Sequence, residues 1–142
     1  MSATDPQTAQ PGFFARHKFT IGLLLYVAGA AADAYFTLGG TGGDLELEGN
    51  PVMRWMMATF GHGVGLVGQK TVIGAGSAFI AVFGARAIKN RAPWIDKMPS
   101  TRWTRAWMRR KDRSWIAYLP LYIVAAAQAL AAGSWVVLGF LY

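Results

Sequence analysis

Two residues of opposite charge, Asp33 and Lys70, each lie inside a long apolar segment. Asp33 falls in the run of residues 19–38, and Lys70 falls in the run of residues 63–88. At the rise of an α-helix, Asp33 would lie about 7 Å and Lys70 about 10 Å below the helix ends that face the same side. Because an isolated charge is costly in hydrocarbon, we expect the two side chains to pair across a helix interface.

Such a pair has two interpretations. A buried pair can simply hold two helices in register. An ionisable residue within a membrane segment is also typical of a proton, ion or ligand site. Thr37 lies one helical turn from Asp33 on the same face and could donate a hydrogen bond to its carboxylate.

Other reactive groups are scarce in the chain. It has no Cys and only two His, which excludes disulfides, Cys-ligated zinc and thiol nucleophiles. His62, between two glycines, could ligate a metal, although a solvated turn residue is the favoured interpretation. Ser77 and Ser134 have no base at helical spacing, and residues 68–71 lack the order of a phosphate loop. We therefore predict no metal, no cofactor and no catalytic residue.

The composition indicates an integral membrane protein. The 142 residues suit one domain, with 54% hydrophobic and 15% charged residues, against about 25% charged in soluble domains. Residues 19–38, 63–88 and 115–141 are each long enough, at about 30 Å or more, to cross a bilayer as a helix. For the first segment a signal peptide is the alternative, with Arg16 and Lys18 as its basic region.

The remaining segments complete an all-α membrane bundle. Residues 1–18 are predicted to be a flexible tail, followed by one membrane domain over residues 19–142. After a glycine-rich, acidic connector, Asn50 and Pro51 are typical of a helix start. The helix of residues 51–60 is too short to span, so it is predicted to be interfacial or re-entrant.

Five polar residues recur in fixed order within this apolar sequence. They form the pattern Asp-x-x-x-Thr, Glu-x-Asn-Pro and Lys, and are Asp33, Thr37, Glu48, Asn50 and Lys70. The pattern, over roughly residues 30–74, resembles an uncharacterised family of small bacterial and archaeal membrane proteins, a domain of unknown function. The resemblance implies a compact bundle of about three helices with these five residues clustered near the outer surface. It implies no activity.

Residues 89–114 form a basic, tryptophan-rich segment. It contains most of the 14 Lys and Arg residues of a chain whose net charge is +7. We predict an amphipathic helix in the membrane plane that contacts anionic lipid headgroups. The residues expected at this interface are Trp94, Trp103, Trp107, Trp115, Arg102, Arg105, Arg109 and Arg110. A nucleic-acid patch would use the same residues, but tethering between two spans favours lipid and predicts no nucleic-acid partner.

The charge distribution predicts an orientation. Loops rich in Lys and Arg stay cytoplasmic, which places the N-terminus and residues 89–114 on the cytoplasmic side. The acidic connector and the C-terminus then lie outside the cell, or in the periplasm of a Gram-negative bacterium. We expect a multi-pass protein of the inner (plasma) membrane.

Small residues predict how the helices pack. Lipid supplies no hydrophobic force between helices, so small residues must let the backbones approach closely. One stripe on the first helix is Gly22, Tyr26, Gly29, Asp33 and Phe36. A second stripe, on the third helix, is Leu121, Ala125, Gln128, Ala132, Trp135 and Gly139. The bundle interior is expected between the two.

The leading functional hypothesis is non-enzymatic. Three thin helices enclose little volume, which favours an accessory or assembly subunit that docks on other transmembrane subunits or forms a homo-oligomer. The alternative is an oligomeric proton- or solute-handling transporter that uses Asp33 and Lys70. A third class is a membrane enzyme acting on lipid headgroups, with Asp33 and Glu48 as acid and base.

Overall fold

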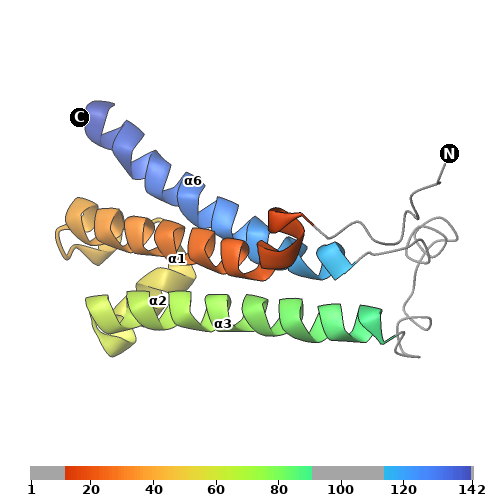
Figure 1. The fold of residues 1–142 in the computed structure, drawn as a ribbon. Helices are drawn as coiled ribbons and strands as arrows, with labels where there is room; N and C mark the ends of the chain where they lie inside the picture. The colour runs from red at the N-terminus through yellow and green to blue at the C-terminus, as the bar shows by residue number, and fades with distance from the viewer. Residues whose placement is uncertain (1–11, 91–113, 142) are drawn as a thin grey trace, which may run out of the picture.

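The computed structural model describes residues 12–90 and 114–141 (Figure 1). Its elements are α1 (Phe13–Thr41), the 3-10 turn η2 (Leu45–Leu47), α2 (Pro51–Phe60), α3 (His62–Lys89), the 3-10 turn η3 (Ser114–Tyr118) and α6 (Leu119–Leu141). Within this part of the chain there are four helices and no strand, which confirms the all-α prediction. Three of the described helices are long and apolar enough to cross a membrane, so the chain is a small multi-pass membrane protein.

The helix bounds differ from the sequence prediction at three main places. The first helix ends at Thr41 rather than at residue 38, so the first three residues assigned to the connector are helical. The first helix begins at Phe13, so residues 13–18 are helical although they were assigned to the flexible tail. No Gly or Pro occurs between Gly12 and Gly22, so nothing local stops the helix from beginning at Phe13. The third long helix begins at Leu119 rather than 115, after a 3-10 turn. Pro120 then stands in its first turn, where the missing N–H costs little.

Close contact between α1 and α6 depends on glycine. A Cβ added at Gly29 would lie 3.2 Å from the backbone nitrogen of Ala129, and one added at Gly22 would lie 3.1 Å from Leu121. This is the small-residue packing expected of helices in lipid. The predicted interior between the two stripes is therefore present, with two exceptions. Phe36 is only half-buried, and Thr37 is buried in its place. Gly139, at the far end of the second stripe, is exposed.

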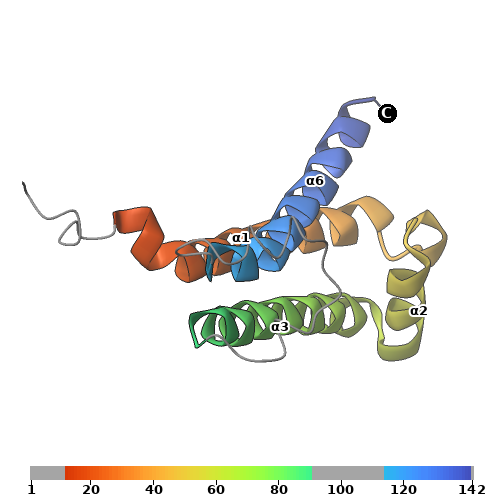
Figure 2. The same ribbon diagram turned by 90° about the vertical axis from the view of Figure 1, so that its right-hand side faces the viewer.

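The second long helix, α3, runs alongside α1, and α2 lies crosswise at one end of the bundle (Figures 1 and 2). Gly74 of α3 faces the ring of Tyr26, so the two helices also meet at a glycine. Figure 1 shows α6 following α1 over its first half and then diverging towards the C-terminus.

The short helix α2 packs on α3. Met53 and Met57 are buried against Leu66, whereas Val52 and Trp55 on the opposite face are exposed. Gly61, with a φ of 86°, makes the turn that reverses the chain between the two helices. The predicted bounds of α2 are those observed, and the helix covers one end of the bundle without running along it.

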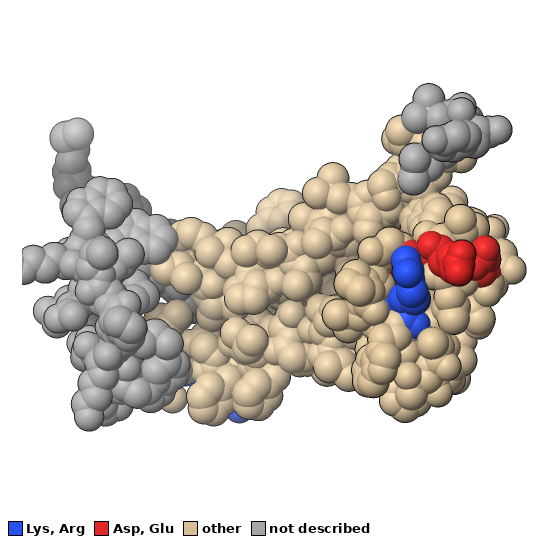
Figure 3. All heavy atoms as spheres, turned by 180° about the vertical axis from the view of Figure 1, so that it is seen from behind, with Lys and Arg blue, Asp and Glu red and all other residues tan. Residues whose placement is uncertain are grey.

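The outer surface of the bundle is apolar. Large side chains such as Leu24, Val72, Phe79 and Ile123 are more than half exposed. In the face seen in Figure 3, the middle of the described bundle carries no visible charge, and acidic and basic side chains gather at the end near α2. A surface of this kind suits lipid or other transmembrane helices.

Candidate functional site

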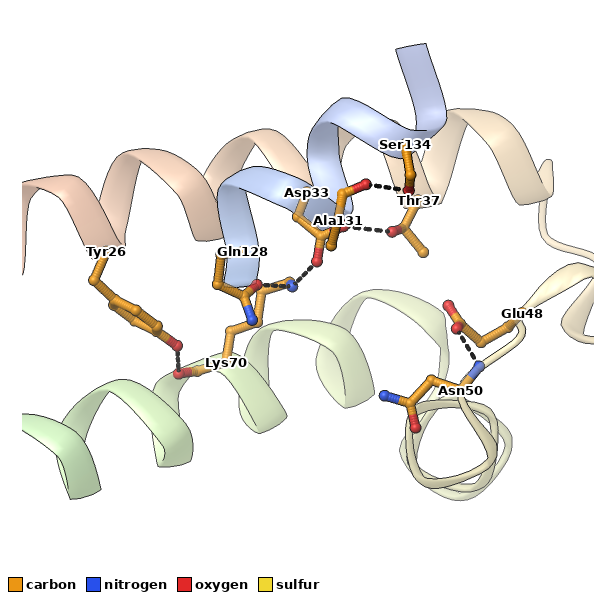
Figure 4. Close-up of polar contacts among 9 residues, drawn as sticks. All are labelled: Tyr26, Asp33, Thr37, Glu48, Asn50, Lys70, Gln128, Ala131 and Ser134. Atoms are coloured by element: carbon orange, nitrogen blue, oxygen red, sulfur yellow. Dashed lines mark hydrogen bonds and ion pairs between the residues drawn. The ribbon is translucent and has the colours of Figure 1, made fainter. Parts of the chain in front are cut away.

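The ion pair expected from the sequence is present in the bundle interior. Lys70 Nζ lies 2.5 Å from Asp33 Oδ2, and the two side chains are 6% and 10% exposed (Figure 4). Asp33 precedes the last residue of α1 by eight positions, and Lys70 follows the first residue of α3 by eight. Each therefore lies about 12 Å from its helix end, and this equal depth is what allows the pairing.

A third helix contributes Gln128 to the same site. Its side-chain oxygen accepts a hydrogen bond from Lys70 Nζ at 2.6 Å. We refer to Asp33, Lys70 and Gln128 as the buried triad, which joins α1, α3 and α6. Sequence reasoning placed Gln128 on the inner face of its helix but left it out of the site. The available signal was that it is the one amide side chain in the uncharged segment 114–142.

Two further hydroxyl groups lie beside the triad. Thr37 Oγ1 is 3.5 Å from Asp33 Oδ1, which is long for a hydrogen bond, so Thr37 adds little to the stability of the carboxylate. The Tyr26 hydroxyl donates to the main-chain carbonyl of Lys70. Since Tyr26 belongs to α1, this bond holds α1 and α3 together next to the ion pair.

Glu48 and Asn50 lie apart from the triad, on the connector (Figure 4). Asn50 Oδ1 accepts from the backbone N–H groups of Val52 and Met53 at 3.0 and 3.3 Å, so its side chain caps α2 as predicted. The Glu48 carboxylate is buried and accepts from the Asn50 N–H at 2.8 Å. Arg54 donates to the main-chain oxygen of Glu48. Within the described residues no hydrogen bond or ion pair joins this group to the triad, so the five residues form two groups.

The predicted lipid interface falls mostly outside the described residues. Trp115 is described; it lies in η3 and is 43% exposed. The residues outside the described part are Trp94, Trp103, Trp107, Arg102, Arg105, Arg109 and Arg110. Their contact with lipid stays a prediction.

His62 has a structural contact. Its Nε2 lies 2.7 Å from the carbonyl oxygen of Gly43, which ties the start of α3 to the turn after α1. This contact makes His62 more than a solvated turn residue. Among residues 12–90 and 114–141 no group of three potential metal ligands comes together.

Comparison of the chain with family models, curated proteins and solved structures gives no match. The resemblance carried by the Asp-x-x-x-Thr, Glu-x-Asn-Pro and Lys pattern therefore stays a prediction.

Proposed function

We propose that this chain is a non-enzymatic accessory or assembly subunit that docks on a larger membrane complex or on a second copy of itself. The supporting observation is a set of glycines on uncovered helix faces. A Cβ added at Gly76 of α3 or Gly133 of α6 would meet no atom of the described residues within 4 Å. Glycine at Gly29 serves close helix contact, and the two uncovered glycines suit the same contact with another helix.

The buried triad fits this role. The charges of Asp33 and Lys70 cancel inside the bundle, and Gln128 adds the third helix. A bundle whose three helices share one polar centre presents its outer faces in a fixed arrangement. Fixed faces reduce the entropy lost on docking.

Purification in a gentle detergent, followed by mass spectrometry and measurement of the assembled mass, tests the proposal. We expect a partner protein, or a second copy of the chain, to co-purify at a constant molar ratio to the chain. The variants Gly76→Leu and Gly133→Leu should reduce that ratio because leucine keeps the helices apart. The matched controls are Val82→Leu on α3 and Ala127→Leu on α6, each six positions from the glycine and so about 120° around the helix on another exposed face, and these should leave the ratio unchanged. A monomer without a partner under all conditions would contradict the proposal.

A proton- or solute-handling transporter is the second candidate. The observation that favours it is the burial of an ion pair about 12 Å from the helix ends, where ionisable groups are typical of transport pathways. If the chain is such a transporter, Asp33→Asn should abolish the uptake of protons or solute into vesicles under a pH gradient. Asp44→Asn, on the exposed connector, should leave that uptake unchanged. A lipid-headgroup enzyme has no such support, since no contact among the described residues joins Asp33 to Glu48.

The orientation and lipid contacts predicted from charge belong to the same proposal. Arg86 and Lys89 lie in the last turn of α3, at the end of the bundle where α1 begins. With the N-terminus and residues 89–114 in the cytoplasm, the basic segment would contact anionic headgroups, each charge contributing about 1 kcal/mol. Replacing Arg102, Arg105, Arg109 and Arg110 by Gln should reduce the anionic lipid that co-purifies with the chain. Tight RNA binding that survives this replacement would contradict the lipid role.

A further inference from the structure

A groove of about 450 Å³ runs between α1 and α3. This volume lies within the range of small-molecule sites in proteins. Its walls are almost entirely apolar, with Ala31 and Ala34 on α1 and Ala75 on α3 among the lining residues. The groove is open along one side, which is at membrane depth when the three long helices span.

Lys70 lines this groove as well as belonging to the buried triad. An ammonium group carries three N–H donors. Asp33 Oδ2 accepts one of them at 2.5 Å and Gln128 Oε1 accepts a second at 2.6 Å. The third has no acceptor among the described residues, although Lys70 is only 5% exposed. A buried donor without an acceptor is unfavourable, so a ligand oxygen at this point would be stabilised.

The charge of the triad limits the ligand. Asp33 and Lys70 already neutralise one another, and a further charge at this depth would be unfavourable. The ligand must therefore be uncharged, accept a hydrogen bond and present an apolar body to the alanine-rich walls. A carbonyl group on a hydrocarbon framework meets these requirements.

Depth distinguishes a free lipid-phase molecule from a phospholipid. Lys70 lies about 12 Å below the start of α3, and α3, at about 42 Å, is longer than the hydrocarbon core of about 30 Å. With α3 centred in the bilayer, Lys70 lies roughly 6 Å inside that core. The ester carbonyls of a phospholipid stay at the edge of that core, because its headgroup holds them there. A molecule without a polar headgroup can place its carbonyl as deep as Lys70.

We propose that the groove between α1 and α3 binds an uncharged, membrane-soluble carbonyl compound of the quinone type, whose oxygen accepts the third N–H of Lys70. This site is separate from the docking faces at Gly76 and Gly133, and it does not depend on them. Thr71 and Ala75 form the α3 edge over which the ligand would enter from lipid.

The test compares the binding of two probes to the full chain in one detergent. Both probes are added at the same mole fraction relative to the detergent. The probes are decyl-benzoquinone and decylbenzene, which has the same tail without carbonyl groups. Affinity is taken from the rise in melting temperature, since a ligand that binds the folded state stabilises it. A hydrogen bond from a charged donor corresponds to about a tenfold gain in affinity, so the quinone should bind about tenfold tighter. Equal binding of the two probes would overturn the proposal.

Variants locate the site. Ala75→Phe should fill the groove and weaken quinone binding about tenfold or more, while Ala126→Phe, on an exposed face of α6 outside the groove, should leave it unchanged. The double variant D33N/K70M removes the donor without leaving a lone charge, and the preference for the quinone should disappear. Unchanged quinone binding by Ala75→Phe would overturn the proposal.

A further comparison distinguishes a free carbonyl compound from the ester carbonyl groups of a phospholipid. An ester-linked phospholipid and its ether-linked analogue differ only in the carbonyl groups. We expect both to stabilise the chain equally. Stabilisation by the ester lipid alone, lost in D33N/K70M, would mean that phospholipid carbonyls reach Lys70, and the proposed ligand class would be wrong.

Discussion

At the scale of single residues, the energetics of the bundle centre on Lys70. Its ammonium is removed from water, and Asp33 and Gln128 replace the lost hydration with a short ion pair and a hydrogen bond. A buried pair of this kind contributes less net stability than its short distance suggests, because both groups lose solvation. Removing only one partner is far more damaging, since the remaining charge keeps its desolvation cost.

This asymmetry predicts a non-additive double-mutant cycle. Asp33→Asn and Lys70→Met should each lower the free energy of unfolding in detergent by about 3–5 kcal/mol. The double variant should recover much of that loss, because no lone charge remains. Thermal unfolding monitored by circular dichroism measures all three variants.

The control for this cycle is Lys89→Met at the exposed end of α3, which should change stability by no more than about 0.5 kcal/mol. Strictly additive losses in the cycle would mean that Asp33 and Lys70 do not interact. Full recovery of stability with partner binding still absent would favour a functional role for the pair over a purely structural one.

At the scale of elements, the turn between α2 and α3 depends on one close approach. A Cβ added at Gly65 would lie 2.5 Å from the main-chain oxygen of Met56, and backbone atoms cannot move aside as a flexible side chain can. Glycine at this position lets α2 fold back onto α3 and bury Met57 and Leu66. The crosswise position of α2 follows from this contact.

Gly65→Ala should therefore destabilise the protein by about 1–3 kcal/mol through steric overlap. Gly68→Ala is the matched control on the same helix. A Cβ added at Gly68 has no atom of the described residues within 4 Å. Alanine has the higher helix propensity, so this control should gain roughly 0.5–1 kcal/mol. Chemical unfolding in mixed micelles gives both values. Equal effects of the two substitutions would show that the α2 contact is absent in solution.

At the scale of the whole molecule, the three long helices alternate in direction. The start of α1, the end of α3 and the start of α6 lie at one end of the bundle, and α2 and the end of α6 lie at the other (Figure 1). Basic residues at the first end and the acidic connector at the second give the charge asymmetry on which the proposed membrane orientation rests.

Reporter fusions measure that orientation. A reporter placed after Tyr142 should be active only outside the cytoplasm, and one placed near Pro99 should be active only inside, because one crossing, α6, separates the two positions. Phosphatase and fluorescent-protein fusions report on the two sides independently. Activity of both fusions on the same side would overturn the three-crossing arrangement.

The sequence by itself determined the elements and one of the contacts. Long uncharged runs predict helices that span a membrane, and the Asn50–Pro51 cap predicts the start of α2, because both depend on neighbouring residues only. The pairing of Asp33 with Lys70 was also predictable, since two opposite charges in hydrocarbon at similar depth have no better partner.

Only the tertiary structure decided which polar groups meet. Gln128 joins the ion pair because α6 packs on α1 at Gly29. That packing depends on which face each helix turns towards the other. Glu48 and Asn50 separate from the pair because capping α2 uses the Asn50 side chain and holds both residues on the connector. The groove beside Lys70 likewise arises from the spacing of α1 and α3. Such features depend on contacts between residues far apart in the chain, which the pattern along one helix does not specify.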